Sequence, residues 1–204
     1  MVYRAAAALA LVLAALALSA CQTLSKEECV VTDWQSLGER EGAAGRSLSR
    51  FSRHVEACKE TSAEPDHAAW SRGHAIGARR FCTPQNGVDA GHSGRGDPSI
   101  CPADLQVGFL KGYRLGEERR ALGSRRDDIG QAIERNVREA DETRDTLRKK
   151  DVDELQIERA LHDLRADRRR LRRELADVDD DIAILGDRIR RIGLVAPAPP
   201  SRTY

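Results

Sequence analysis

Residues 161–192 read LHDLRADRRRLRRELADVDDDIAILGDRIRRI and carry the strongest structural signal in the chain. Their apolar side chains recur every three or four positions, at Leu161, Leu164, Leu171, Leu175, Val178, Ile182, Leu185, Ile189 and Ile192. Arg168 is the polar residue that interrupts this stripe. A helix with one apolar stripe at heptad spacing packs that stripe against another helix, as in a coiled coil. The stretch therefore predicts a mainly helical protein.

The stripe continues towards the N-terminus with more polar interruptions, and no proline occurs between Pro102 and Ile192. Two architectures fit this pattern. One is a continuous rod that buries its stripe against other chains, and the other is an antiparallel hairpin. Lys149 and Lys150 suit a helix C-terminus, and Asp151 with Glu154 three residues later resembles a helix N-cap with its capping-box partner. The sequence therefore places the turn of a hairpin at residues 150/151.

Charge patterning favours the hairpin over the rod. Residues 117–193 contain 20 basic and 21 acidic side chains. With the predicted turn, opposed residue numbers add up to about 301, so the acidic run 177–181 faces the basic residues at 119–126. The basic run 168–173 likewise faces Asp127, Asp128 and Glu134. A parallel dimer would stack the basic run against its own copy, which is unfavourable. The acidic run one turn later, together with the export signal described below, favours a self-pairing face over an RNA or lipid patch.

The preceding part of the chain has a repeated glycine pattern. Gly38-x3-Gly42-x2-Gly45 recurs as Gly87-x3-Gly91-x2-Gly94, and Trp70-x2-Gly73-x3-Gly77 recurs as Phe109-x2-Gly112-x3-Gly116. We interpret residues 29–77 and 82–116 as a degenerate duplication. Glycines at i and i+4 share one helix face, and each costs about 1 kcal/mol relative to alanine. Close helix packing is the expected compensation, in preference to a binding groove.

Two segments are predicted to lack regular structure. Residues 83–98 are rich in Gly, Pro, Asn, Asp and Ser, which is typical of a loop. Residues 194–204 form a Pro/Ala-rich tail that we expect to be disordered.

The N-terminus has the organisation of an export signal. Arg4 precedes an unbroken apolar run from Ala5 to Leu18, which is too short to span a bilayer but fits a signal peptide. The sequence Leu-Ser-Ala-Cys that ends at Cys21 resembles the lipobox of bacterial lipoproteins. This resemblance implies diacylglyceryl and palmitate attachment at Cys21. The following Gln22, by the sorting rule of such lipoproteins, implies the outer membrane.

Four further cysteines remain, which is an even number in an exported chain: Cys29, Cys58, Cys82 and Cys101. They predict two disulfides. Three pairings are possible, and we favour Cys29–Cys58 with Cys82–Cys101 because these close the shortest loops. The alternative is a metal site that includes nearby histidines, but no pair has ligand spacing.

Residues 29–116 resemble a family of small bacterial lipoproteins described only as a domain of unknown function. The resemblance rests on these features: Cys29-x4-Trp34-x3-Gly38-x3-Gly42-x2-Gly45, His54-x3-Cys58, Pro65-Asp66, Gly73-x3-Gly77, Phe81-Cys82-Thr83-Pro84-x-Asn86-Gly87, Gly91-x2-Gly94, Cys101-Pro102 and Gly112-Tyr113-x2-Gly116. Trp70 stands where the family has Tyr, and residues 96–99 depart from an aromatic-containing stretch. The family implies a location and domain limits, but no activity.

Composition excludes several functional classes. The 204 residues include 34 basic and 33 acidic side chains, so the net charge of +1 gives no overall attraction to nucleic acid. Only 4% of residues are aromatic, and 18 of the first 20 residues are apolar, so the remainder is poor in core-forming side chains. A large enzyme with a thick core and a polytopic membrane protein are therefore both disfavoured.

The expected fold is mainly α, with a small disulfide-linked Gly-rich helical domain followed by a long charged helical hairpin or coiled coil. The expected segments are a signal peptide (1–20), a lipidated linker (21–28), the duplicated Gly/Cys-rich domain (29–116), a coiled-coil arm (117–193) and the tail (194–204).

The expected function is that of a non-enzymatic, lipid-anchored protein of the outer membrane that faces the periplasm. It would use no cofactor or metal and would meet a protein partner, or a second copy, through residues 117–193. Two alternatives remain open. A hydrolase would draw on His54, Asp66, His67, His74, Asp89 and His92, and a ligand-binding module would use an apolar pocket lined by Trp34, Trp70 and Phe109.

Overall fold

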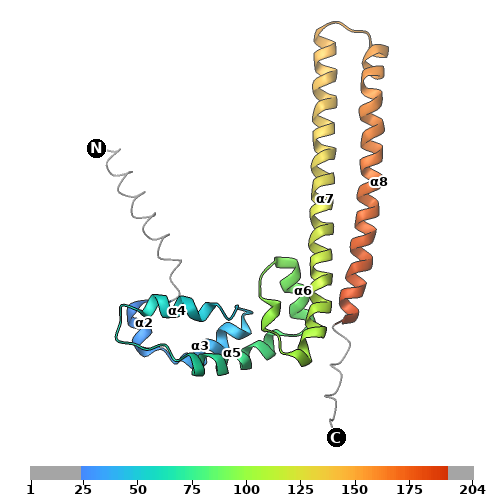
Figure 1. The fold of residues 1–204 in the computed structure, drawn as a ribbon. Coiled ribbons are helices and arrows are strands. Elements are labelled where there is room, and N and C mark those ends of the chain that lie inside the picture. Colours follow the sequence, from blue (N-terminus) through green and yellow to red (C-terminus); the bar gives the residue numbers. More distant parts are fainter. Residues whose placement is uncertain (1–23, 193–204) are drawn as a thin grey trace, which may run out of the picture. The chain divides into compact units, whose positions relative to one another are not determined.

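The structure is a computed structural model that describes residues 24–192, and this part of the chain is mainly helical without strands (Figure 1). Its elements in chain order are α2 (Lys26–Val31), α3 (Trp34–Ala43), α4 (Arg50–Cys58), α5 (His67–Phe81), α6 (Pro84–Ser93), the 3₁₀ turn η1 (Pro98–Ile100), α7 (Ala103–Lys149) and α8 (Glu154–Ile192). The expected signal peptide, the lipidated Cys21 and the expected tail lie outside the described residues.

The chain forms two compact units. The first contains α2 to α5 together with residues 96–102, and the second contains residues 82–95 together with α7 and α8. Helix α7 runs without a break across residues 116 and 117, where the sequence places a domain boundary. The second unit therefore combines part of the glycine-rich region with the long charged helices.

In the first unit, α3 and α5 pack with their backbones in direct contact. A Cβ atom at Gly38 would overlap the carbonyl oxygen of Trp70, and one at Gly73 would overlap the carbonyl oxygen of Gln35. Gly42 and Gly77 meet the opposite helix in the same way, one turn later. The residue numbers rise together on both helices, so the helices are parallel. We call this the first glycine pair.

The second unit contains an equivalent pair, formed by α6 and the first turns of α7. A Cβ atom at Gly87 would overlap the carbonyl oxygen of Phe109, and one at Gly112 would overlap that of Pro84. Gly91 and Gly116 repeat the contact one turn later. We call this the second glycine pair. In both pairs the glycines are packing positions, as the sequence predicts, and not the lining of a groove.

The prediction of a loop over residues 83–98 is wrong, because residues 84–93 form α6. The hydroxyl of Thr83 accepts a hydrogen bond from the backbone N–H of Asn86, and Pro84 occupies the first turn, where its missing N–H costs nothing. Gly94, with φ +66°, ends the helix. Residues of low helix propensity form a helix here because the backbone contact with α7 compensates for their propensity.

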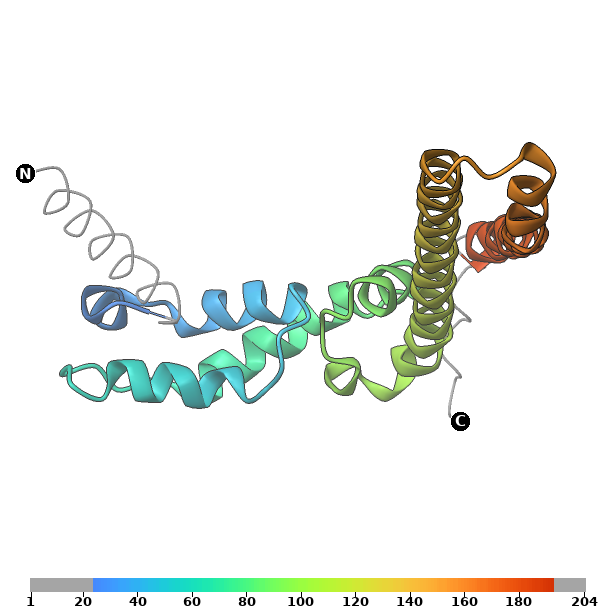
Figure 2. The ribbon, with the colours of Figure 1, turned by 90° about the horizontal axis from the view of Figure 1, so that it is seen from above.

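Helices α7 and α8 form an antiparallel hairpin and lie side by side in two views (Figures 1 and 2). Asp151 has φ +54°, a left-handed conformation that Asp tolerates better than most residues, so the turn needs no glycine. The N-cap of α8 is Asp153, whose carboxylate accepts from the backbone N–H of Gln156 at 3.1 Å. The prediction of Asp151 as the cap is therefore wrong by two residues.

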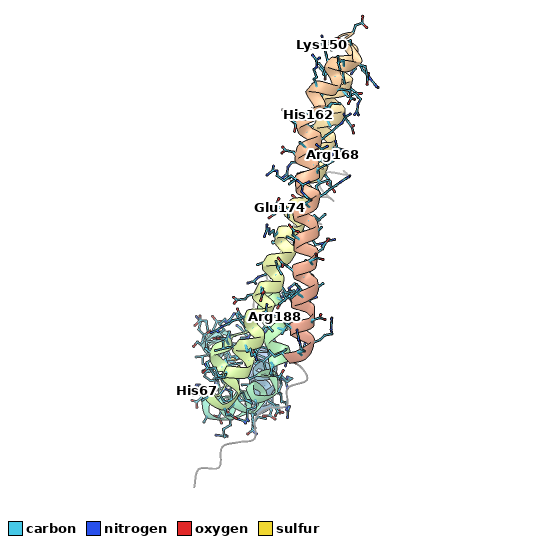
Figure 3. The ribbon with its side chains drawn as sticks, turned by 90° about the vertical axis from the view of Figure 1, so that its right-hand side faces the viewer. His67, Lys150, His162, Arg168, Glu174 and Arg188 are labelled. Atoms are coloured by element: carbon cyan, nitrogen blue, oxygen red, sulfur yellow. A yellow bond between two sulfur atoms is a disulfide. The ribbon has the colours of Figure 1, made fainter. Side chains whose placement is uncertain are left out.

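The register of the hairpin agrees with the predicted charge pairing. Arg126 pairs with Asp179 at 2.7 Å, Arg125 with Glu174 at 3.6 Å, and Arg148 with Glu154 at 3.9 Å. Arg188 pairs with Glu118 at 2.8 Å near the end of the hairpin opposite Lys150, so ion pairs between the two helices occur along its length (Figure 3). The antiparallel hairpin, and not the continuous rod, is thus the arrangement of α7 and α8.

The hairpin has two separate apolar clusters. One lies near the turn and contains Ala140, Ile157 and Leu161. The other lies at the opposite end, where Val88 of α6 joins Leu115, Leu185 and Ile192. No helix among residues 24–192 is long and apolar enough to cross a membrane.

Candidate functional site

The four cysteines within the described residues are all disulfide-bonded: Cys29, Cys58, Cys82 and Cys101. Cys29 pairs with Cys58, with their Cα atoms 5.7 Å apart, and both side chains are buried. This bond ties α2 to the end of α4 within the first unit. The prediction of disulfides is thus confirmed.

The aromatic rings named as a possible apolar pocket are packed inside helical units instead. Trp70 and Phe109 have no exposed surface, and Trp34 is 8% exposed. The Phe51 ring lies between the two tryptophans, with its centroid 6.1 Å from that of Trp34 and 5.4 Å from that of Trp70. The ring positions therefore serve packing, and the prediction of an open pocket lined by them is wrong.

Among the described residues, no hydrogen bond or ion pair joins any two of the polar residues named as possible catalytic groups. His54 and His74 are buried, whereas Asp66, His67, Asp89 and His92 are exposed. His74 Nε2 donates to the backbone carbonyl of Arg46 at 2.7 Å, and Asp66 accepts from the backbone N–H of Ala69 at the start of α5. Within residues 24–192, no group of three or more His, Cys, Asp or Glu side chains is placed to hold a metal ion.

The main polar cluster of the first unit surrounds Glu41, a residue that the sequence analysis did not single out. Its carboxylate accepts hydrogen bonds from Arg50 Nε at 3.0 Å, from His54 Nε2 at 2.9 Å and from Trp70 Nε1 at 2.8 Å. Three helices therefore meet at one buried carboxylate: α3 supplies Glu41, α4 supplies Arg50 and His54, and α5 supplies Trp70. We call these four residues the Glu41 cluster.

The Glu41 carboxylate is stabilised in its charged form. Burial raises the pKa of this carboxyl, but the hydrogen bonds from His54, Trp70 and Arg50 outweigh burial, so its pKa lies below the ordinary value. A buried carboxylate that accepts several hydrogen bonds holds its donors in one arrangement. The cluster therefore fixes α4 against the first glycine pair, and its saturated carboxylate has a structural role.

A sequence signal for Glu41 exists in retrospect. Glu41 lies three residues after Gly38 and directly before Gly42, so it sits on the helix face that the glycines press against α5. A charged residue on a buried face needs partners, and α4 and α5 supply them.

Comparisons with known proteins were informative for only one part of the chain. Residues 33–118 match the model of a family described as "Protein of unknown function (DUF2799)", which is less than half of the chain. The matched part contains both glycine pairs and ends at the second residue after Gly116, so most of the hairpin lies outside it. No curated protein and no solved structure matches the chain. The similarity therefore concerns the glycine-paired helices and brings no activity.

Proposed function

We propose that this chain is a lipid-anchored protein of the bacterial outer membrane that faces the periplasm and presents the α7–α8 hairpin to a protein partner or to a second copy. In this proposal the protein is not an enzyme, and each glycine pair holds the helices of its own unit together. The hairpin is the observation that carries the interaction role.

The hairpin offers far more surface than its own packing uses. Helix α8 has 39 residues and is about 58 Å long at 1.5 Å per residue. Only five of these side chains are buried: Ile157, Leu161, Val178, Leu185 and Ile192. Leu155 and Ile184 are large apolar side chains that remain 62% and 60% exposed. Exposed apolar residues within a charged surface are suited to contacts with another protein.

Three features support the anchored location. Cys21 ends a lipobox-like sequence, and its acyl chains would hold the protein firmly, because each buried CH₂ contributes about 0.8 kcal/mol. Val30 and Val31 of α2 lie nine and ten residues later and are 61% and 81% exposed, as suits a helix close to a bilayer surface. The buried Cys29–Cys58 disulfide is typical of an oxidising compartment.

The anchor is tested by metabolic labelling with a palmitate analogue followed by mass spectrometry of the mature N-terminus. We expect a labelled chain that begins at an acylated Cys21, and loss of the label in a Cys21→Ser variant. Cys58→Ser is the matched control, because it removes a cysteine of a different role and should keep the label. An unmodified Cys21 in a chain that retains residues 1–20 would overturn the location.

The interaction role is tested by site-specific photo-crosslinking in cells. A photoreactive amino acid at Leu155 or at Ile184 should give a discrete product, whose identity or doubled mass distinguishes a different partner from a second copy. Val55 of α4, which is 44% exposed, provides a control position of similar character in the first unit. The absence of a product from both hairpin positions would contradict the role given to the hairpin.

A further inference from the structure

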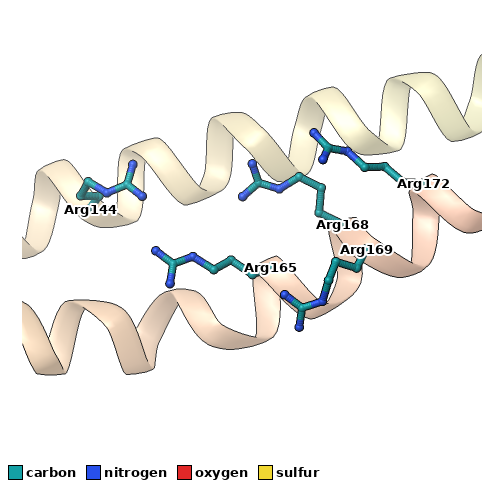
Figure 4. A pocket seen from close by; sticks show the side chains of 5 residues that line it. All are labelled: Arg144, Arg165, Arg168, Arg169 and Arg172. Atoms are coloured by element: carbon teal, nitrogen blue, oxygen red, sulfur yellow. The ribbon is translucent and has the colours of Figure 1, made fainter.

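Five arginines of the hairpin line one open hollow with a volume of about 300 Å³. Arg144 comes from α7, and Arg165, Arg168, Arg169 and Arg172 come from two successive turns of α8 (Figure 4). Figure 4 shows Arg168 and Arg172 extending across towards α7, and Arg165 and Arg144 approaching each other from opposite helices. We call these five residues the arginine cluster. The hollow is of the size of small ligand sites, which begin at about 300 Å³.

The positive charge of this cluster is only partly compensated. Arg165 donates to both carboxylate oxygens of Glu158, and Arg144 pairs with Asp141 at 3.2 Å. The hydrogen bond from Arg165 lowers the pKa of Glu158, and the charge of Arg144 lowers it further. Arg168, Arg169 and Arg172 form no ion pair with any residue between 24 and 192. The expected pairing of the run 168–173 with acidic residues of α7 is therefore absent among residues 24–192, and three cations of the arginine cluster remain unpaired there.

The arginine cluster lies where charged side chains lower the stability of the hairpin. Arg168 stands at a stripe position, where an apolar residue would extend the packing between α7 and α8. On α8, the apolar cluster near the turn ends at Leu164 and the cluster at the opposite end begins at Leu185, with the buried Val178 between them. Like charges that converge without counter-charges also destabilise the helix that carries them. Four arginines within eight residues, placed where they weaken the hairpin, point to a ligand that neutralises them.

We propose that the arginine cluster binds clustered phosphate groups, as in a diphosphate or the phosphomonoester headgroup of a lipid. A guanidinium presents its N–H donors as a planar fork that matches phosphate oxygens, and several arginines together suit a ligand with more than one negative charge. A single carboxylate would balance only one of the three unpaired arginines. The charge pattern alone predicts a self-pairing face for this run, and the arrangement of the side chains in the hairpin favours a phosphate site instead.

The proposal is tested by calorimetric titration of the full chain in a neutral detergent at 0.15 M NaCl. Pyrophosphate is the soluble probe, and micelles doped with phosphatidic acid or, as the neutral comparison, with phosphatidylcholine are the lipid probes. Binding of pyrophosphate identifies a soluble ligand, and binding of phosphatidic acid alone identifies a headgroup. Binding of neither probe would overturn the proposal.

Two triple variants distinguish binding at the arginine cluster from non-specific attraction to a positively charged surface. Replacing Arg168, Arg169 and Arg172 with Ala should weaken binding by at least about tenfold. Replacing Arg119, Arg135 and Arg159 with Ala removes the same charge from exposed hairpin positions and should change the affinity by less than about threefold. Equal losses in the two variants would overturn the proposal, since any positive surface would then suffice.

A lysine variant keeps the positive charge, and it serves as a control in case the alanine variant loses binding because it does not fold. With Arg168, Arg169 and Arg172 all replaced by Lys, we expect an affinity between those of the unchanged protein and the alanine variant, because lysine lacks the planar fork. Circular dichroism verifies that the helix content is retained. Binding as tight as that of the unchanged protein would overturn recognition by guanidinium groups. None of these results depends on acylation of Cys21 or on crosslinking from the hairpin, so this proposal and the proposed function fail separately.

Discussion

The two glycine pairs share a backbone arrangement but differ in what surrounds it. In each, four glycines at i and i+4 spacing let parallel helices touch, carbonyl oxygen against glycine Cα. The first pair adds the Glu41 cluster and the Cys29–Cys58 disulfide. In the second pair Ala90 holds the position of Glu41, and Phe109 holds that of Trp70. The second pair is instead extended by the apolar cluster that Val88 forms with the hairpin.

This difference shows that glycine contact alone does not complete either unit. A glycine face buries little apolar area, because it has no side chains to bury. Each pair therefore needs a further source of stability, which is a polar cluster with a disulfide in one unit and the apolar cluster shared by α6, α7 and α8 in the other. Both tryptophans of the chain, Trp34 and Trp70, lie in the first unit, so tryptophan fluorescence reports on that unit specifically.

The largest expected loss of stability comes from adding a methyl group at the contact between the glycine helices. Gly73→Ala and Gly112→Ala each place a methyl group on a carbonyl oxygen of the opposite backbone, so the helices must separate. We expect each change to destabilise its own unit by about 4 kcal/mol or more. Urea unfolding followed by tryptophan fluorescence should register Gly73→Ala strongly. Gly112→Ala should appear mainly in circular dichroism. A loss below 1 kcal/mol for both would show that the pairs are not in backbone contact.

Removal of the Cys29–Cys58 disulfide should cause the next largest loss of stability, and only in the first unit. Joint replacement of Cys29 and Cys58 by Ser should cost the first unit about 3 kcal/mol, because the unfolded chain gains freedom. Urea unfolding of the first unit, followed by tryptophan fluorescence, measures this loss. The second unit should keep its hydrogen-exchange protection in α7 and α8. Equal loss of protection in both units would contradict their separate stabilisation.

Glu41→Gln should destabilise the first unit by about 2 kcal/mol at pH 7, because an amide cannot accept all three hydrogen bonds. The folded pKa of Glu41 is lowered, so its contribution is present above the unfolded pKa of about 4.3 and is lost as the pH falls through the folded pKa. The difference between the unchanged protein and the variant should therefore shrink below about pH 4. Tryptophan-monitored unfolding between pH 3 and pH 7 measures this difference, and a gap that stays constant would exclude a charged Glu41.

The smallest expected effect is a gain in stability. Gly123 lies in α7 beyond the second glycine pair, and a Cβ atom there would meet nothing within 4 Å. Gly123→Ala should stabilise the second unit by about 0.5–1 kcal/mol through helix propensity. Thermal unfolding followed by circular dichroism measures the gain. A loss similar to that of Gly112→Ala would mean that glycine is required throughout α7 and not only at the pair.

The features that sequence reasoning predicted depend on periodicity and charge. The stripe of α8 predicted packing against another helix, and the charge order of residues 117–193 favoured the antiparallel hairpin with the pairing seen in Arg126–Asp179. Helix α6 and Glu41 are two of the features that were missed. Helix α6 was read as a loop from its composition, and Glu41 was overlooked because a single glutamate has no local signature. Both depend on residues distant in sequence: the glycines of α7 for α6, and Arg50, His54 and Trp70 for Glu41.

By itself the sequence determined the mainly helical class, favoured the hairpin over the rod and predicted that four cysteines form disulfides, because it contains a repeated apolar stripe, an ordered charge pattern and an even number of these cysteines. Tertiary packing alone settled which glycine meets which carbonyl oxygen, that Glu41 is enclosed by donors from α4 and α5, and that three arginines which line one hollow form no ion pair with any residue that the structure describes. Contacts of this kind depend on side chains meeting across helices, and a local pattern contains no information about the partner that a helix will find.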